Sequence, residues 1–225
     1  MKKLSINDLE ALARSLPSMG GRQIGEFLRN SARRAPANTS FVELGCWLGS
    51  GTAQMALGLR DREGIDGISI HCFDRWTASN AEVEKAAKEG VELSQGSNTL
   101  PWVQDKLDRF DVPISYTRGS IDDAYWPGNP ISLFVDDATK GGKTAVNALR
   151  KFGPSWIPRT TIVVFMDFHF WRKTGDDKHK FHKRLVEAHP ESFIPLEDRL
   201  HGSVHAFKYN KEFDFSNEKE LAVFI

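Results

Sequence analysis

Three segments of this chain are almost entirely apolar, and each is followed by a stretch with helical periodicity. They read FVELG (residues 41–45), ISLFVD (131–136) and TIVVFM (161–166). Strands that are apolar on both faces occur in parallel sheets covered by helices on both sides. Parallel neighbours need a crossover of a dozen or more residues, which the helical stretches supply. The alternation predicts an α/β fold with a mostly parallel sheet.

Seven strands are expected in all, at residues 40–45, 68–73, 114–117, 131–135, 160–166, 193–196 and 204–209. Helical patterns fall at residues 51–60, 81–92, 102–110 and 143–152. The last two strands are separated by EDRLHGS, which is too short for a crossover helix. We therefore expect them to pair antiparallel, which gives a seven-stranded sheet with an antiparallel edge strand and helices on both faces.

The chain of 225 residues, 40% of them apolar, can bury a complete core. We expect one structural domain, with an N-terminal helical cap over residues 1–36 and the sheet within residues 37–225. The polar segment 78–104 is longer than a minimal crossover requires. It is interpreted as a lid, an oligomer contact or a loosely packed surface helix.

The charge balance argues against two classes of partner. Lys plus Arg and Asp plus Glu number 30 each, so no net field attracts nucleic acid or an anionic membrane. No apolar stretch reaches the roughly 18 residues of a membrane span. The N-terminal MKKLSINDLEAL has the pattern of an amphipathic helix, not of a signal peptide. A soluble, cytoplasmic protein that binds neither nucleic acid nor membrane is expected.

Two features, a glycine-rich turn and an acidic residue, point to a ligand-binding site. Gly45, Gly49 and Gly51 follow the first strand, and glycine lets backbone approach a ligand closely, although structural turns use it too. Their order does not match G-x-G-x-x-G, so a ligand without a pyrophosphate is favoured. Asp74 ends the second strand, where a carboxylate accepts hydrogen bonds from both hydroxyls of a ribose. Capping of the next helix is the alternative role for Asp74.

With Gly119-Ser120 in YTRGS and Asp136 closing ISLFVD, these motifs resemble the class I S-adenosylmethionine-dependent methyltransferases. The pattern ELGCWLGSGT, then FDRW, then LFVD resembles the bacterial O-methyltransferases that modify sugars and related metabolites. The resemblance covers roughly residues 37–170. It implies a Rossmann-like methyltransferase fold, S-adenosylmethionine as cofactor and a small-molecule acceptor.

The resemblance also implies roles for individual residues. Glu43 stands near the ammonium of the cofactor, and Asp74 takes the ribose. Trp76 covers the adenine and Trp47 lies near the sulfonium, unless both tryptophans are plain packing. The cofactor-binding set is Glu43, Gly45, Trp47, Gly49, Gly51, Thr52, Asp74, Trp76, Gly119, Ser120 and Asp136.

Methyl transfer needs a group that takes the acceptor's proton or stabilises its charge. Asp136 and Asp167 end the fourth and fifth strands, and His169 is an alternative base. In the metal-dependent sugar methyltransferases that the chain resembles, strand four runs into Asp-Gly-Asp-His. Here it reads Asp136-Asp137-Ala138-Thr139, so the second acid and the histidine are absent. Asp136 and Asp167 are the candidate ligands for Mg²⁺.

The cysteines and two further histidines are expected to have structural roles and not catalytic or metal-binding ones. Cys46 and Cys72 are expected to pack as small apolar residues. His179 and His182 are expected on a solvated helix that begins near Asp176.

Arg172 and Lys173 follow the fifth strand and would attract an anionic acceptor such as a nucleotide sugar. A homo-oligomer is left open.

Three functions are therefore weighed. The first is an enzyme that methylates an oxygen of a small metabolite or sugar unit. The second is a methyltransferase-like binding module without activity. It would explain Ala138 and Thr139, and also Phe168, which stands where the resembled enzymes often have a second carboxylate after strand five. The third is a nicotinamide-dependent oxidoreductase, against which the glycine order argues.

Overall fold

The computed structural model describes residues 4–18, 20–197, 200 and 202–224. Its seven-stranded sheet has the order β3-β2-β1-β4-β5-β7-β6. The strands are β1 (Ser40–Leu44), β2 (Ser69–Asp74), β3 (Ile114–Arg118), β4 (Ile131–Asp136), β5 (Ile162–Phe165), β6 (Phe193–Glu197) and β7 (His205–Tyr209). β1 to β5 are parallel, while β7 pairs antiparallel with both β5 and β6. The predicted fold class is confirmed, and the antiparallel strand lies between β5 and the outermost β6.

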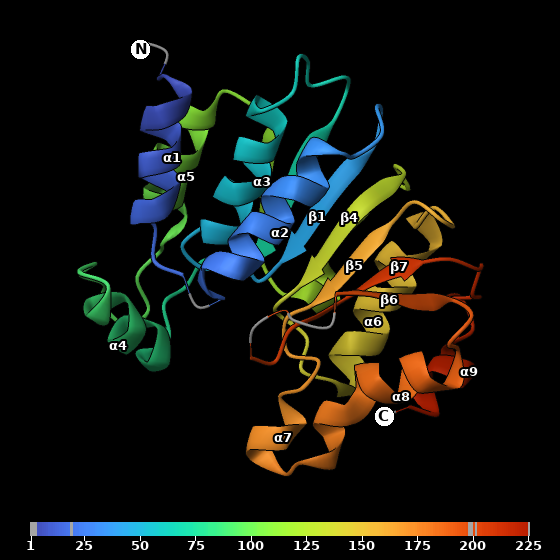
Figure 1. The fold of residues 1–225 in the computed structure, drawn as a ribbon. Helices are drawn as coiled ribbons and strands as arrows, with labels where there is room; N and C mark the ends of the chain where they lie inside the picture. Colours follow the sequence, from blue (N-terminus) through green and yellow to red (C-terminus); the bar gives the residue numbers. More distant parts are fainter. Residues whose placement is uncertain (1–3, 19, 198–199, 201, 225) are drawn as a thin grey trace.

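Helices cover both faces of this sheet (Figure 1). On one side are α1 (Ile6–Ser15), α2 (Gly21–Arg33), α3 (Ser50–Arg60) and α5 (Leu100–Leu107), and on the other α6 (Gly142–Phe152), α8 (Phe181–Ala188) and α9 (Glu218–Ala222). α4 (Asn80–Lys88) lies apart from the sheet (Figure 1). The short α7 (Trp171–Thr174) follows β5. The sheet separates two buried clusters, as the strand pattern predicts.

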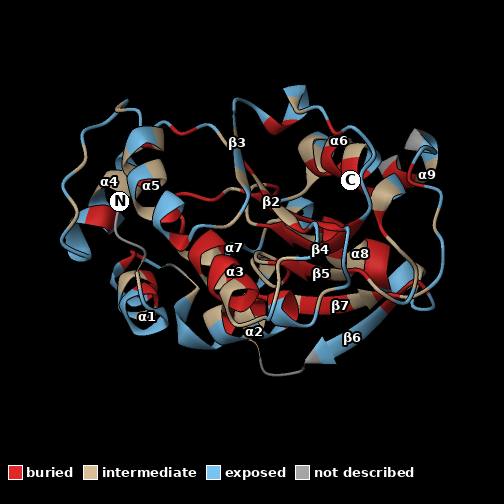
Figure 2. Cartoon of the chain, turned by 90° about the horizontal axis from the view of Figure 1, so that it is seen from above, coloured by how far each residue is buried: buried red, intermediate tan, exposed pale blue. Residues whose placement is uncertain are grey.

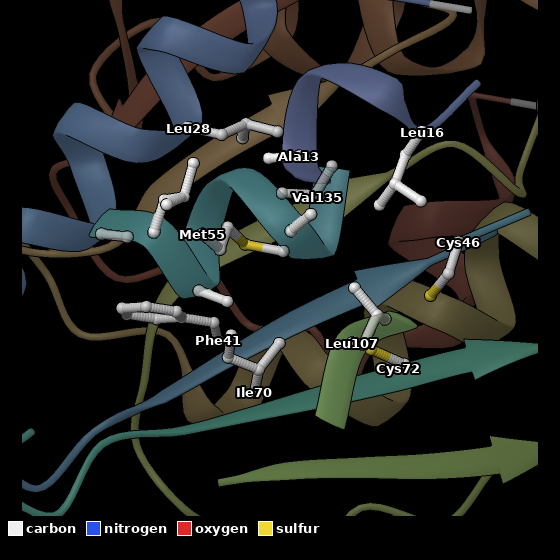
Figure 3. Close-up of a cluster of buried hydrophobic side chains, with 14 of the residues drawn as sticks. Ala13, Leu16, Leu28, Phe41, Cys46, Met55, Ile70, Cys72, Leu107 and Val135 are labelled. Atoms are coloured by element: carbon white, nitrogen blue, oxygen red, sulfur yellow. The ribbon is translucent and has the colours of Figure 1, made fainter. Parts of the chain in front are cut away.

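The first cluster joins the sheet to α2 and α3. Figure 3 shows Phe41 and Ile70, from neighbouring strands, with Met55 of α3 and Leu28 of α2. The second cluster lies around Phe134 on the opposite face. Figure 2 shows β4 and β5 buried between the two layers, whereas β6 is exposed at the edge.

The N-terminal helices are tied to α3. Arg29 of α2 pairs with Asp61 after α3 (Nε to Oδ2, 2.6 Å) and with Glu10 of α1 (Nη2 to Oε1, 2.7 Å). A Cβ on Gly58 of α3 would overlap the carbonyl oxygen of Arg29, so the two helices approach as closely as only glycine allows. The predicted division of the chain into a helical cap (residues 1–36) and a sheet-containing part (residues 37–225) stays a prediction.

Most predicted elements lie within two residues of the observed ones, with three exceptions. The helix expected at 81–92 ends at Lys88, because Gly90 has a positive φ of 77° and breaks the helix. The helix expected from Asp176 is a 3₁₀ turn followed by α8. In the predicted turn EDRLHGS, Asp198, Arg199 and His201 lie outside the described residues.

Within the part of the chain that the structure describes, no helix has both the length and the apolar character needed to cross a bilayer.

Candidate functional site

A cavity of about 770 Å³ opens at the carboxyl ends of the parallel strands. Each of the five parallel strands β1 to β5 contributes a residue from its end or from the loop after it. These include Gly45 and Trp47 after β1, Asp74 at the end of β2, Gly119 and Ser120 after β3, Asp137 and Lys140 after β4, and Asp167 after β5. This edge is where open parallel sheets bind their ligands.

The turn after β1 reaches the turn after β4 through Gly45. Gly45 has a φ of 82°, and a Cβ there would lie 2.9 Å from the carbonyl carbon of Asp137. Its N–H donates to the carbonyl of Phe73 at 2.8 Å. Gly49, with a φ of 80°, precedes α3 and packs against Leu107, so its role is structural. Of these two glycines, Gly45 alone lines the cavity.

Glu43 lies beside a smaller hollow of about 50 Å³, which shares Gly45, Trp47 and Asp137 with the main cavity. The Thr52 hydroxyl donates a hydrogen bond to the Glu43 carboxylate. Burial raises the pKa of Glu43 to about 7, and the Thr52 hydrogen bond opposes that rise. A Cβ on Gly51 would overlap Glu43 Oε1, so glycine at 51 makes room for the acid.

Both cysteines are buried and free, as the sequence predicts. One ligand atom each of Glu43, Cys46 and Cys72 lies within 4.8 Å of the others. The Cys72 Sγ lies 3.4 Å from Thr52 Oγ1, and Cys46 Sγ lies 3.4 Å from the carbonyl oxygen of Glu43. Burial raises the pKa of the Cys46 thiol well above its ordinary value, which makes Cys46 a poor nucleophile.

Asp74 holds two turns at once. Its Oδ2 accepts the N–H of Trp47 at 2.9 Å and its Oδ1 accepts the N–H of Trp76 at 2.7 Å. Burial raises the pKa of Asp74, and these two hydrogen bonds oppose the rise. Each carboxylate oxygen accepts more than one hydrogen bond, so both retain capacity for a ligand.

The two tryptophans differ in their placement. Trp47 lines the cavity, with a φ of 46° that turns its backbone N–H to Asp74. Trp76 is completely buried in the first core cluster and meets the Tyr116 ring edge-on at a centroid distance of 6.3 Å. For Trp76, the packing alternative therefore holds.

After β3, Gly119 and Ser120 both line the cavity. The Gly119 N–H donates to the Asp74 carbonyl at 3.0 Å, which joins the ends of β2 and β3. The Ser120 hydroxyl accepts the N–H of Asp122 at 3.2 Å and retains its own proton as a donor.

The expectation for Asp136 needs correction. Asp136 Oδ1 accepts hydrogen bonds from the N–H groups of Ala138 and Thr139, and Oδ2 accepts one from the Thr139 hydroxyl. Asp136 is only 2% exposed. Asp136 therefore lies inside the protein and organises the loop after β4. The acid that lines the cavity is Asp137, which sequence reasoning passed over. Strand alternation is the missed signal, because successive side chains on β4 point to opposite faces.

Asp137, Asp167 and Lys140 form the acidic end of the cavity. Lys140 Nζ pairs with Asp167 Oδ2 at 2.9 Å. Burial raises the pKa of Asp137 well above its ordinary value, and the charge of Asp167 adds to the rise while Lys140 opposes it.

The histidines lie elsewhere than expected. His169 does not line the cavity; it faces His205, with Nε2 3.4 Å from His205 Nδ1, and burial lowers the pKa of His169 to about 4. His182 is 4% exposed and stacks on Phe165 at 4.1 Å, with its Nε2 3.5 Å from Asp136 Oδ2. The solvated helix expected for His182 is therefore wrong. His179 lies in the 3₁₀ turn, 2.8 Å from the Thr174 hydroxyl.

Further cationic side chains line the cavity. Lys173 lines the cavity together with Arg75, whereas the Arg172 guanidinium lies over the Trp171 ring at 5.4 Å. The polar segment 78–104 contributes Ser79, Glu82 and Lys85 from the start of α4. This segment is thus a wall of the site.

The residues proposed for Mg²⁺ do not fit that ion. The Asp136 oxygens already bind groups of their own loop, and Asp167 is paired with the Lys140 ammonium. Among the described residues, the one cluster of three potential ligands is Glu43, Cys46 and Cys72, which includes neither Asp136 nor Asp167. Mg²⁺ requires oxygen ligands with open access for its waters.

Searches with models of known protein families and among curated proteins found no match to the chain. Solved structures do match. The O-methyltransferase NovP superposes with a TM-score of 0.62 at 12% identity, over 87% of this chain and 83% of NovP. Apo CalS11, a TDP-rhamnose 3'-O-methyltransferase of calicheamicin biosynthesis, gives 0.60 at 13%, over 92% and 80%. Cofactor-bound Rv0187 from MTB gives 0.53 at 16%, over 92% and 90%.

At these identities the likeness establishes the fold. The chain has the Rossmann-like fold of the class I S-adenosylmethionine-dependent methyltransferases, and the resemblance that the sequence motifs indicate is confirmed at that level.

Proposed function

We propose that this protein is an S-adenosylmethionine-dependent methyltransferase that acts on an oxygen of a small metabolite or sugar unit. One observation carries the proposal. The residues assigned to the cofactor, Gly45 and Asp74, line the same cavity as a carboxylate suited to an acceptor, Asp167. A cavity of about 770 Å³ lies within the usual range for small-molecule sites.

The cofactor side fits the nucleoside and amino-acid parts of S-adenosylmethionine. Both Asp74 oxygens can accept from a ribose diol while they hold the turns at Trp47 and Trp76. Glu43 lies beside the adjoining hollow, where its carboxylate would face an ammonium. Ser120 keeps a hydroxyl for the adenine edge. When bound, the cofactor supplies a methyl group on a sulfonium, and transfer to the acceptor oxygen leaves a neutral thioether.

The acceptor side offers carboxylates for the proton of a hydroxyl group. Asp167 and Asp137 both line the cavity, and a carboxylate within reach of the acceptor hydroxyl can act as a general base. We assign proton removal to this pair and not to Asp136 or His169.

The class of acceptor is inferred from charge. Arg75, Lys85 and Lys173 line the cavity, so an acceptor with phosphate or carboxylate groups would be attracted. CalS11 acts on TDP-rhamnose, which is a nucleotide sugar of this kind. We propose an anionic, sugar-containing acceptor for this chain, and a cytoplasmic location with S-adenosylmethionine as cofactor. A homo-oligomer is compatible with this proposal but is not required by it.

The second candidate is a binding module that holds the cofactor without turnover. It is favoured by the loop after β4, where Ala138 and Thr139 stand in place of metal-binding groups. The nicotinamide oxidoreductase is the least supported candidate, because the glycine order lacks the pyrophosphate motif.

The test is calorimetric titration of S-adenosylmethionine and S-adenosylhomocysteine, followed by an acceptor panel of nucleotide sugars. Micromolar binding with methyl transfer supports the enzyme, and binding without consumption of the cofactor supports the module. Absence of binding, with binding of reduced nicotinamide instead, would exclude both.

A further inference from the structure

Lys140 bridges the carboxyl ends of β4 and β5. It belongs to the loop after β4, and its ammonium pairs with Asp167 after β5 at 2.9 Å. The ammonium also lies 4.6 Å from the ring centroid of Phe170. A carboxylate and an aromatic face thus both attract the charge.

The ammonium is open to the cavity although its partner is buried. The Lys140 side chain is 51% exposed, whereas the Asp167 side chain is 12% exposed. Both residues line the cavity, together with Asp137 from the neighbouring strand end. The contact with Asp167 is an ion pair, and an ammonium carries three protons, so Lys140 can offer a donor to a ligand oxygen.

We propose, on the basis of the methyltransferase function proposed above, that Lys140 supplies the positive charge of the acceptor site and that the protein needs no divalent metal. The ammonium donates a hydrogen bond to the acceptor oxygen as that oxygen gives up its proton to a carboxylate. The oxygen then forms the bond to the methyl carbon while the carbon–sulfur bond breaks toward sulfur. The lysine keeps all its protons throughout.

The alternative role for this half-exposed ion pair is a contribution to stability, which pairs of this kind make only weakly. The two readings differ in what removal of the ammonium creates. In the proposed site, a neutral side chain at 140 leaves two carboxylates at adjacent strand ends facing one cavity. Such a pair is suited to bind a divalent cation.

The experiment therefore uses Mn²⁺ as the probe. Its binding is measured by the decrease in the electron paramagnetic resonance signal of the free ion. Wild type, Lys140→Met and Lys140→Met/Asp167→Asn are compared, with Lys173→Met as the matched control on the same cavity. We expect Mn²⁺ to bind Lys140→Met at least about tenfold more tightly than wild type. The added Asp167→Asn change should abolish the gain, and Lys173→Met should show none.

Wild type that binds Mn²⁺ as tightly as Lys140→Met would overturn the proposal, and so would a Lys140→Met variant with no gain. Lys140→Gln, with thermal melting of each variant, guards against a folding defect. S-adenosylhomocysteine titrations of the same proteins test the proposed function separately. If wild type did not bind S-adenosylhomocysteine, the proposed function would be refuted, whatever the affinities for Mn²⁺. Where methyl transfer is found, excess EDTA should leave the wild-type rate unchanged.

Discussion

Asp74 Oδ2 accepts the backbone N–H of Trp47 at 2.9 Å, so the ribose-binding candidate also fixes the glycine turn. The same carboxylate binds the N–H of Trp76 through its other oxygen at 2.7 Å. Asp74 therefore shapes the site before any ligand enters it. Its loss would affect both the turn and the ligand.

The first prediction concerns Asp74→Asn. The amide keeps one carbonyl acceptor for the N–H groups but loses the second acceptor and the charge. Hydrogen bonds to charged groups contribute about 1.5–3 kcal/mol, so we expect the dissociation constant of S-adenosylhomocysteine to rise at least about tenfold. Calorimetry measures it. Asp105→Asn, at an exposed residue that pairs with Lys106, is the control and should bind as wild type does.

The second prediction concerns pH and Glu43. Unfolded chains lose this proton near pH 4.5, while the folded protein keeps it to about pH 7. The free energy of unfolding should therefore fall as pH rises through that window, by about 3 kcal/mol in total. Glu43→Gln stays neutral and should gain stability over wild type between pH 5 and 8, as measured by urea unfolding.

For that measurement, the exposed Glu84 of α4 provides the control variant Glu84→Gln, which removes a carboxylate from the surface and leaves the buried site intact. A Glu43→Gln profile parallel to that of wild type would show that Glu43 is ionised throughout the window.

The third prediction concerns the contact of α2 with α3. A Cβ on Gly58 would overlap the Arg29 carbonyl oxygen and the Ala32 Cβ, and neither can move without the helix. Overpacking of this kind costs about 1–3 kcal/mol, so Gly58→Ala should lower the melting temperature by several degrees.

In Gly25→Ala the new Cβ meets only the flexible Gln54 side chain, at 3.1 Å, and the helix gains from alanine. Gly25→Ala should therefore melt at or above the wild-type temperature. Equal losses in the two variants would mean that close approach at Gly58 is not the cause.

The sequence predicted the sheet because each strand carries its own signal. Residues 41–44 and 131–135 are buried on both faces and, apart from Glu43 and Ser132, apolar, and this pattern is typical of central parallel strands. Gly45 and Asp74, which the sequence assigns to the cofactor, both line the cavity, because each stands at or directly after the carboxyl end of a parallel strand.

The acceptor side could not be predicted in the same way. Asp136 and Asp137 are adjacent and chemically identical, and only the direction of the last residue of β4 decides which one enters the cavity. His182 lies 46 residues beyond Asp136, yet packs at 3.5 Å from it, because α8 returns across the sheet. Contacts of this range depend on tertiary packing, which periodicity does not carry.

The fourth prediction separates two neighbouring cations. Lys173 lines the cavity, whereas Arg172 lies over Trp171. With an anionic acceptor from the panel, Lys173→Glu should raise the Michaelis constant for the acceptor about tenfold, because a like charge replaces an attractive one. Arg172→Glu should change it less than about twofold. Equal effects of both variants would indicate a general surface potential in place of a specific contact.

The fifth prediction concerns the group that takes the acceptor's proton. Asp167 lines the cavity, while His169 lies outside it against His205 and stays neutral at physiological pH, because burial lowers its pKa to about 4. In steady-state assays Asp167→Asn should lower kcat by about 100-fold or more, the usual range for a general base. His169→Gln should keep kcat within about twofold of wild type, since its ring reaches no reacting atom. If His169→Gln instead lost activity while binding S-adenosylhomocysteine normally, the imidazole and not the carboxylate would be the base, and the loop after β5 would have to turn His169 into the cavity during the reaction.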